Sequence, residues 1–477
     1  MQEKRLQNRI SLFTFALTIL VIWVHSVNLT PQQLLDAGFT SGGAGALGSG
    51  LSVGMAGMGE EVSYEGSFLS GYSLWFHQLL LGIELFLTNN IGQIAVPGFF
   101  MVSAYLFFRN VPKEQVAMEQ APMGGELFKK KLFPTGFRAW LLGKWKSRVF
   151  SVLIPFFLWN LLYYLFHLIP SLLLSAVGVS GAEYVPVNGR AIFGALFQYS
   201  YNPVFWYLGE LILLIVLAPL LYLLVRGRRA GLIVLLLSFL SAMFWPVLPV
   251  HLVNEDALFY YLLGAYAAMH KKEWIEEGRK VGLLAFVSFL LCLPALFTTF
   301  FTGSLSEILS DFLSGSLLKG GLLTCAPFLS EGIRTGTVVL FRASLPSFLF
   351  FGSFLLSKKN SRFLAFLSRE RLPGFLRINF LIYATHYLVV RGLNRAALFL
   401  LSRDIFSMGS GSAGGFALAG FPESTAALFH PLTGWILILL FLLYLLLPIL
   451  CVLAACVLSA FLRRFMPGAL RLLSGGR

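Results

Sequence analysis

Charged residues are scarce in this sequence, because Asp, Glu, Lys and Arg together make up only 12% of its 477 residues. A soluble domain carries roughly 25%, and here hydrophobic residues reach 57% with a mean hydropathy of +0.78. A water-soluble fold is therefore excluded. Apolar runs recur along the chain, and a helix of about 20 such residues crosses a hydrocarbon layer of about 30 Å. The sequence thus predicts an all-α, polytopic membrane protein.

Cysteine is rare as well. The four cysteines, Cys292, Cys325, Cys451 and Cys456, include no pair with metal-ligand or disulfide spacing. The cysteines are therefore expected to be inert. We also expect no metal site and no tightly bound cofactor. The first apolar segment, residues 10–29, lacks a small-residue cleavage site after it, which favours a retained signal anchor over a removed signal peptide.

We expect about ten transmembrane helices in a single integral-membrane domain over residues 1–477. The predicted spans are 10–29, 93–108, 149–169, 205–225, 230–250, 257–270, 282–302, 337–357, 378–398 and 433–461. An even number of crossings puts both termini on one side. Most of the 36 Lys and Arg lie at the termini and after the even-numbered spans, so the positive-inside rule makes these segments cytoplasmic.

The net charge of +14 does not indicate a nucleic-acid partner, because the basic residues lie in short segments between apolar spans. Membrane lipids are the expected partner, since anionic headgroups attract such clusters. Residues 109–148 are predicted to form a basic cytoplasmic segment. Residues 30–73 are predicted to form a flexible, Gly-rich outer loop, because their composition cannot bury enough apolar surface to order the chain.

One apolar run is ambiguous. Residues 74–88 are interrupted by His77, Gln78 and Glu84. The run could form an interfacial or re-entrant helix, or an additional crossing that would invert the topology downstream of it. The distribution of basic residues opposes the inversion.

A few ionisable residues fall inside predicted spans, where they cost free energy and usually face a partner or a wet cavity. His25 lies in the outer third of the first span, and an imidazole there can exchange protons with a hydroxyl near neutral pH. A hydrogen bond to a neighbouring helix explains His25 equally well. Packing or ion pairing is favoured for Glu210 and Arg342. His386 lies on a helix face that is polar toward its outer end, where a cavity is plausible.

Five segments, in order along the chain, resemble the acyltransferase 3 family of bacterial membrane O-acyltransferases that modify surface glycans. They are the first helix closing on His25, the stretch from Val96-Pro97 through Phe99-Phe100 to Ser103 and Tyr105, the basic entry Lys144 to Arg148 before Pro155-Phe156, the helix starting at Phe205-Trp206 with Pro219, and Ile382-Tyr383 with His386. Each is weak alone, but five in order with a ten-span topology make a strong pattern.

The resemblance implies an O-acyltransferase in the cytoplasmic membrane that moves an acyl group, expected to be acetyl, from cytoplasmic acyl-CoA to a hydroxyl of an extracytoplasmic glycan or glycolipid. His25 is the catalytic candidate, as a general base or through an acyl-imidazole. Arg109, Lys144 and Arg148 are placed to contact the polyanionic donor. Ser103, Tyr105 or Tyr383 could stabilise the oxyanion. The remaining substrate-binding candidates are Trp206, Glu210 and His386.

The sequence departs from the family at one point. Members often carry an arginine eleven residues before the first-span histidine, and this chain has Thr14 there, which puts that donor contact in doubt. The nearest cation is Arg9, about 7.5 Å further along the helix. A transporter or flippase for a glycan precursor is the alternative function, although no inverted repeat is evident. The sequence is also compatible with a homo-oligomer.

Overall fold

The computed structural model describes residues 2–30, 71–112, 133–177, 185–244, 254–276, 278, 280–294, 326–410 and 423–476. Within these ranges the regular structure is helical and no strand occurs, as the sequence predicts. Residues 31–70 of the predicted outer loop, residues 113–132 of the predicted basic segment, and the ends of the predicted spans 230–250 and 282–302 lie outside the described residues.

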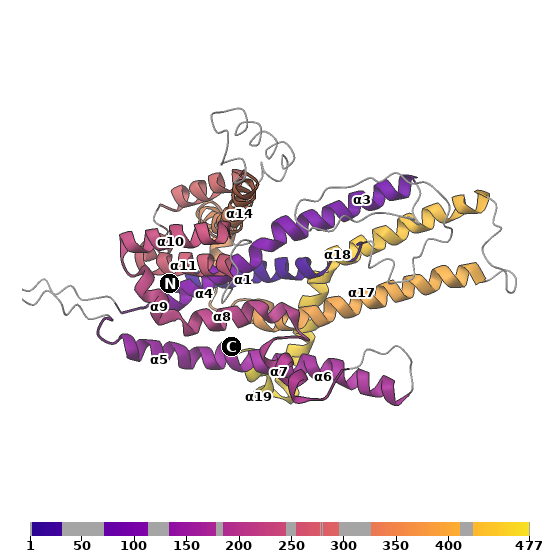
Figure 1. Ribbon diagram of the computed structural model, residues 1–477, viewed down its shortest axis with the longest axis horizontal. Helices are drawn as coiled ribbons and strands as arrows, with labels where there is room; N and C mark the ends of the chain where they lie inside the picture. Colours follow the sequence, from indigo (N-terminus) through magenta and orange to yellow (C-terminus); the bar gives the residue numbers. More distant parts are fainter. Residues whose placement is uncertain are drawn as a thin grey trace, which may run out of the picture. The chain divides into compact units, whose positions relative to one another are not determined.

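The helices follow one another along the chain as Figure 1 shows. Their bounds are α1 Gln2–His25, α3 Gly71–Phe86, η1 Leu87–Ile91, η2 Gly92–Ile94, α4 Ala95–Phe108, α5 Phe137–Arg148, η3 Val149–Leu153, α6 Ile154–Ala176, α7 Gly189–Phe197, η4 Pro203–Phe205, α8 Trp206–Val216, α9 Ala218–Val225, α10 Arg228–Met243, α11 Glu255–His270, α12 Lys272–Glu276, the apolar helix Val281–Pro294, α14 Ala326–Lys359, α15 Ser361–Leu367, α16 Gly374–Arg377, α17 Asn379–Ser410, α18 Glu423–Phe465 and α19 Pro467–Leu473.

Five helical stretches in the described part of the chain are long and apolar enough to cross a membrane, and a sixth is a bent pair. The five are Glu3–His25, Trp75–Phe108, Phe137–Ala176, Gly332–Lys359 and Trp435–Phe465. The chain is therefore a helical membrane protein. The full count of ten crossings and the cytoplasmic position of both termini stay predictions.

Helix α18 illustrates why these stretches suit lipid. Its residues Leu453 and Val457 lie four positions apart and are exposed, whereas Leu447, Cys451 and Ala455 are fully buried. Residues three and four apart share a helix face. One face of α18 thus packs inward, while large apolar side chains cover the other, which is favourable only next to hydrocarbon.

The ambiguous run 74–88 and the predicted span 93–108 belong to one helical stretch, Trp75–Phe108. The predicted boundary at residue 93 is therefore wrong. A π-helical turn, η1, and a short 3-10 turn, η2, join α3 to α4 without a break. Thr88 in η1 is buried. The polar residues His77, Glu84 and Thr88 interrupt the apolar pattern because they bind main-chain atoms of residues 23–29.

Two further boundaries differ from the prediction. Residues 137–148, expected in the basic cytoplasmic segment, form α5 and continue through η3 into α6 as one stretch, Phe137–Ala176. The predicted span 205–225 is bent by 68° between α8 and α9. Pro219 causes this bend, since a proline in the second position of α9 cannot donate a backbone hydrogen bond to the preceding turn.

The chain forms two compact units. The first comprises residues 1–17, 94–381 and 458–477. Within it, α4 packs against α11, and α10 packs against α11 and α14. Gly264 of α11 lies so close to the main chain of Met101 in α4 that a Cβ atom would overlap it. Small residues permit such close packing of membrane helices.

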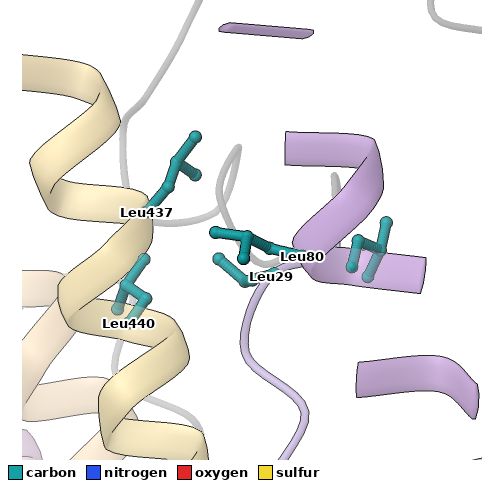
Figure 2. Packing of buried hydrophobic residues seen from close by; sticks show 5 residues of the cluster. Leu29, Leu80, Leu437 and Leu440 are labelled. Carbon is teal, nitrogen blue, oxygen red and sulfur yellow. The ribbon is translucent and has the colours of Figure 1, made fainter. Parts of the chain in front are cut away.

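The second unit comprises residues 18–93 and 382–457. Its apolar core joins the segment after α1 to α3 and α18, and Figure 2 shows leucines of the three elements turned toward one another. The cluster consists of Leu29, Leu80, Leu81, Leu437 and Leu440. This core fixes the surroundings of the C-terminal end of α1, which carries His25.

Candidate functional site

Two imidazoles face one another in the second unit. His25 is the last residue of α1, and its ring centroid lies 5.4 Å from that of His386 in α17. The ring of Tyr387 meets His25 edge-on at 5.8 Å, and the ring of Tyr383 lies 5.7 Å from His386. The structure therefore brings together three residues predicted for the site: His25, Tyr383 and His386.

The two histidines differ in their surroundings. His25 is partly exposed, whereas His386 is fully buried. Nδ1 of His386 lies 2.5 Å from the carbonyl oxygen of Tyr383, and a carbonyl only accepts, so Nδ1 carries the hydrogen. Nε2 of His386 is then the unprotonated nitrogen, and it has no hydrogen-bond partner among the described residues. A buried imidazole in this state can accept a proton.

The turn that follows His25 is held by polar side chains. Oε2 of Glu84 in α3 lies 3.3 Å from the backbone nitrogens of both Asn28 and Leu29. Nε2 of His77, also in α3, lies 2.8 Å from the carbonyl oxygen of Leu29. Both side chains are buried. The polar residues that interrupted the run 74–88 therefore bind the main chain next to His25.

Further contacts come from η1, α17 and α18. Thr88 donates to the carbonyl oxygen of Trp23, and its hydroxyl lies 3.2 Å from that of Tyr444. Asn394 donates to the carbonyl oxygen of Ser26, and Asn28 donates to that of Leu440. Helix α1 thus ends inside a network that leaves few backbone groups of the turn without a partner.

In the first unit, predicted residues on α4 already have partners. The hydroxyl of Ser103 lies 3.2 Å from that of Tyr207 in α8. Tyr105 donates to Oε1 of Glu276 at 3.1 Å. Neither hydroxyl belongs to the unit that contains His25. Of the three predicted oxyanion donors, only Tyr383 lies in that unit.

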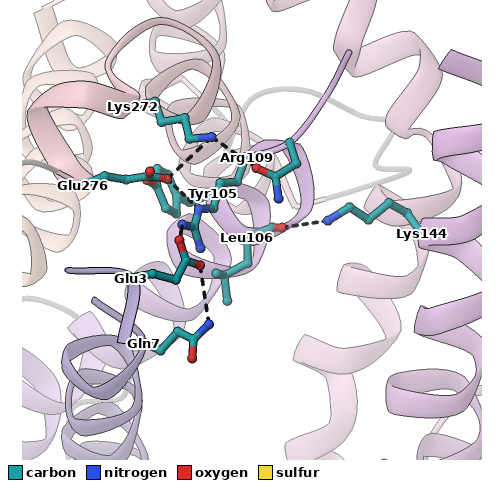
Figure 3. Close-up of polar contacts among 9 residues, drawn as sticks. Glu3, Gln7, Tyr105, Leu106, Arg109, Lys144, Lys272 and Glu276 are labelled. Atoms are coloured by element: carbon teal, nitrogen blue, oxygen red, sulfur yellow. Dashed lines mark hydrogen bonds and ion pairs between the residues drawn. The ribbon is translucent and has the colours of Figure 1, made fainter. Parts of the chain in front are cut away.

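Arg109 forms two ion pairs rather than standing as a free cation. Its Nε lies 2.5 Å from Oε1 of Glu276, and its Nη2 lies 2.7 Å from Oε2 of Glu3. Figure 3 draws both ion pairs. Burial alone would lower the pKa of Arg109, but the hydrogen bonds and negative charges of Glu276 and Glu3 outweigh it, so the net pKa shift is upward. Arg109 therefore ties the start of α1 to α4 and α12.

Lys144 and Arg148 lie in the last two turns of α5. Lys144 donates to the carbonyl oxygen of Leu106 at 3.2 Å (Figure 3). The hydroxyl groups of Tyr207 and Tyr261 lie within electrostatic range of Arg148. Within the described ranges neither cation pairs with a carboxylate. Both therefore keep positive charge available for an anion.

Trp206 and Glu210 lie one turn apart at the start of α8, also in the first unit. Both are partly exposed. Glu210 lies within electrostatic range of Tyr199. Arg342 forms an ion pair with Asp256, with 4.0 Å between Nη1 and Oδ2, in agreement with the ion-pair interpretation of Arg342.

Arg9 has an environment that the sequence did not reveal. The residue is 5% exposed, and its guanidinium donates to the hydroxyls of Ser353 and Ser357 at 2.9 and 3.2 Å and stacks over the ring of Phe354. The two serines lie four residues apart on α14 and so share a helix face, a spacing that is visible in the sequence. Arg9 thus fixes α1 to α14 within the first unit.

The sequence also missed Glu84 and His77 as parts of the site. Their signal was present, because His77, Glu84 and Thr88 are spaced seven and four residues apart and therefore lie on one helix face. Among the described residues no group of three or more His, Cys, Asp or Glu could hold a metal ion. The arrangement offers proton exchange at His25 and His386, and anion binding at Lys144 and Arg148.

The family model described as an acyltransferase domain, Acyl_transf_3, matches residues 62–420, which is most of the chain. No curated protein and no solved structure matches the chain.

Proposed function

Because the chain belongs to the acyltransferase 3 family and is a helical membrane protein, we propose that it moves an acyl group, acetyl in the simplest case, from cytoplasmic acyl-CoA to a hydroxyl of an extracytoplasmic glycan or glycolipid. The family makes it a membrane acyltransferase. The donor, the acceptor and the location in the cytoplasmic membrane are the proposed parts.

The observation that carries this proposal is the facing pair of His25 and His386. In the general-base route, His25 takes the proton of the acceptor hydroxyl while the hydroxyl oxygen attacks the thioester carbonyl carbon. The C–S bond then breaks, the proton passes to the sulfur, and the products are the ester and CoA thiol. In the acyl-imidazole route, a ring nitrogen of His25 attacks the thioester carbonyl carbon, the C–S bond breaks, and CoA leaves as the thiol with the proton from the ring. The acceptor hydroxyl then attacks the acyl-imidazole, which gives the ester and returns a proton to His25. The proposal includes both routes.

His386 and Tyr383 have supporting roles in this proposal. The unprotonated Nε2 of buried His386 stabilises the cationic imidazolium that forms on His25 when it accepts the proton. The hydroxyl of Tyr383 donates to the oxyanion of the tetrahedral intermediate. Its ring lies 5.7 Å from His386, which supports Tyr383 over Ser103 and Tyr105 for this task.

Donor binding is proposed for Lys144 and Arg148. The nucleotide end of acyl-CoA is polyanionic, and phosphate groups bind Lys and Arg side chains through charge-assisted hydrogen bonds. Both cations lack a carboxylate partner among the described residues. Arg109 is already paired with Glu276 and Glu3, so its proposed contribution is to position α4 and α1.

Reconstitution of the purified chain tests the proposal. In proteoliposomes supplied with acetyl-CoA and a glycan acceptor, the wild-type chain should release CoA thiol and acylate the acceptor. His25→Ala should abolish both. His167→Ala is the matched control, because His167 lies in the first unit, where its Nδ1 binds the carbonyl oxygen of Tyr163 one turn earlier in α6, and it should keep wild-type activity.

Full acyl transfer by His25→Ala at wild-type protein levels would contradict the proposed role of His25. Movement of a glycan precursor across the membrane without any need for acetyl-CoA would instead favour the transporter or flippase alternative.

A further inference from the structure

We propose that Glu84 is a positioning residue for His25: its carboxylate holds the turn that follows α1 and thereby sets the orientation of the His25 imidazole. The inference rests on the proposed function, because it assigns Glu84 a part in the acyl transfer that His25 performs.

The geometry of the turn supports this role. Helix α1 ends at His25, and residues 26–30 have no helical structure. The backbone N–H groups of Asn28 and Leu29 therefore lack a helical acceptor, although both residues are fully buried. Oε2 of Glu84 accepts from both, at 3.3 Å each. One carboxylate oxygen thus satisfies two buried donors three and four residues beyond His25.

The burial of an ionisable side chain at position 84 also points to a function. Its side chain is fully buried in a helix of a membrane protein, and no cation pairs with it among the described residues. An ionisable group at such a position is costly, so its presence points to a function. The two backbone N–H groups are the partners that hold the carboxylate in place.

Other side chains bind the carbonyl oxygens of the same turn, whereas Glu84 binds the backbone N–H groups of Asn28 and Leu29. His77 binds the carbonyl oxygen of Leu29, and Asn394 binds that of Ser26. Without Glu84, two buried donors would lose their acceptor, and the turn would shift to find another. Because His25 lies at the start of this turn, its ring would move with it, and a displacement of about 1 Å at a reacting group costs about a hundredfold in rate.

The experiment compares three variants with the wild-type chain. Glu84→Ala removes the acceptor. Glu84→Gln keeps an acceptor oxygen and removes the ionisable group. Gln78→Ala is the matched control, because Gln78 is a partly exposed polar residue of the same helix, α3, and makes no contact with the turn among the described residues. Each protein is reconstituted with acetyl-CoA, kcat and the KM for acetyl-CoA are measured, and hydrogen exchange is followed in the peptide that contains Asn28 and Leu29.

For Glu84→Ala we expect kcat to fall about a hundredfold and the KM for acetyl-CoA to stay within about twofold, since the proposed donor contacts lie elsewhere. The amides of Asn28 and Leu29 should exchange faster. Glu84→Gln should restore protection and most of kcat, and Gln78→Ala should behave as wild type. A general loss of folded structure would change KM and exchange throughout the protein, so this pattern separates positioning from stability.

Wild-type kcat and wild-type exchange in Glu84→Ala would overturn the inference while leaving the proposed function intact. An inactive wild-type chain would instead remove the proposed function. In that case unchanged exchange at Asn28 and Leu29 in Glu84→Ala would still overturn the contact on which the inference depends.

Discussion

At the scale of single residues, the two facing histidines are set apart by their burial. His386 is sealed in the second unit with its Nδ1 bound to a carbonyl oxygen, whereas His25 is partly exposed at the end of its helix. A group that exchanges protons with a substrate needs access, and a group that supports it needs a fixed orientation. These requirements favour His25 for the proposed reacting role and His386 for the proposed supporting role.

Donor affinity provides a prediction at this scale. Lys144→Ala or Arg148→Ala should raise the KM for acetyl-CoA about tenfold, since a charge-assisted contact contributes about 1.5–3 kcal/mol. The KM should also depend less on salt in either variant, because one charge fewer attracts the phosphates. Initial rates at several acetyl-CoA and salt concentrations measure both effects.

Lys146→Ala is the control for this pair, because Lys146 lies on the same helix and is exposed. Its KM should match wild type. Equal KM values for Lys146→Ala and both other variants, whether raised or unchanged, would contradict a specific donor contact at Lys144 and Arg148.

The positions of His25 and His386 in apolar segments were visible in the sequence, and so was the family pattern around them. The partners of Arg109 were not, because Glu3 and Glu276 lie 106 and 167 residues away along the chain. A spacing argument covers a few helical turns only. The sequence therefore placed Arg109 in a donor site without its two carboxylate partners.

At the scale of helices, the stretch from α3 to α4 differs most from the sequence-based expectation. His77, Gln78 and Glu84 broke the apolar pattern and suggested a separate element, yet the structure forms one continuous stretch, Trp75–Phe108. His77 and Glu84 bind main-chain atoms of the turn that follows α1, and Thr88 in the π turn binds the main chain of the last turn of α1. A π turn inserts an extra residue into a helix and is frequent at functional sites. Hydropathy alone does not reveal such partners.

The contact between α4 and α11 leads to a prediction about stability. Gly264→Ala should destabilise the protein, because the new methyl group would overlap the main chain of Met101. Overpacking of this kind costs about 1–3 kcal/mol. The expected result is a lower Tm of the purified protein in detergent, measured by thermal unfolding.

Gly352→Ala is the matched control, because Gly352 also lies in an apolar helix and a Cβ there meets nothing within 4 Å. Its Tm should be unchanged or slightly raised, since alanine favours helix more than glycine. A Tm for Gly264→Ala as high as that of Gly352→Ala would contradict close packing of α4 on α11.

At the scale of the whole molecule, composition was enough to predict a helical membrane protein, because nothing else explains 57% hydrophobic residues. The motifs were enough to predict the family, which the match over residues 62–420 confirms. Which segments form each unit was not predictable, because each unit combines segments that are distant in the chain. The predicted site residues are divided between the two units. Tertiary packing decides such groupings, and a single sequence carries little information about it.

The measurement that tests the central claim most directly is mass spectrometry of surface glycans from three cell lines: one lacking this protein, one expressing the wild-type chain, and one expressing His25→Ala at an equal membrane level. The account predicts an ester-linked acyl group on the glycan only with the wild-type chain. The same acyl group in cells that express His25→Ala, or in cells that lack the protein, would contradict it.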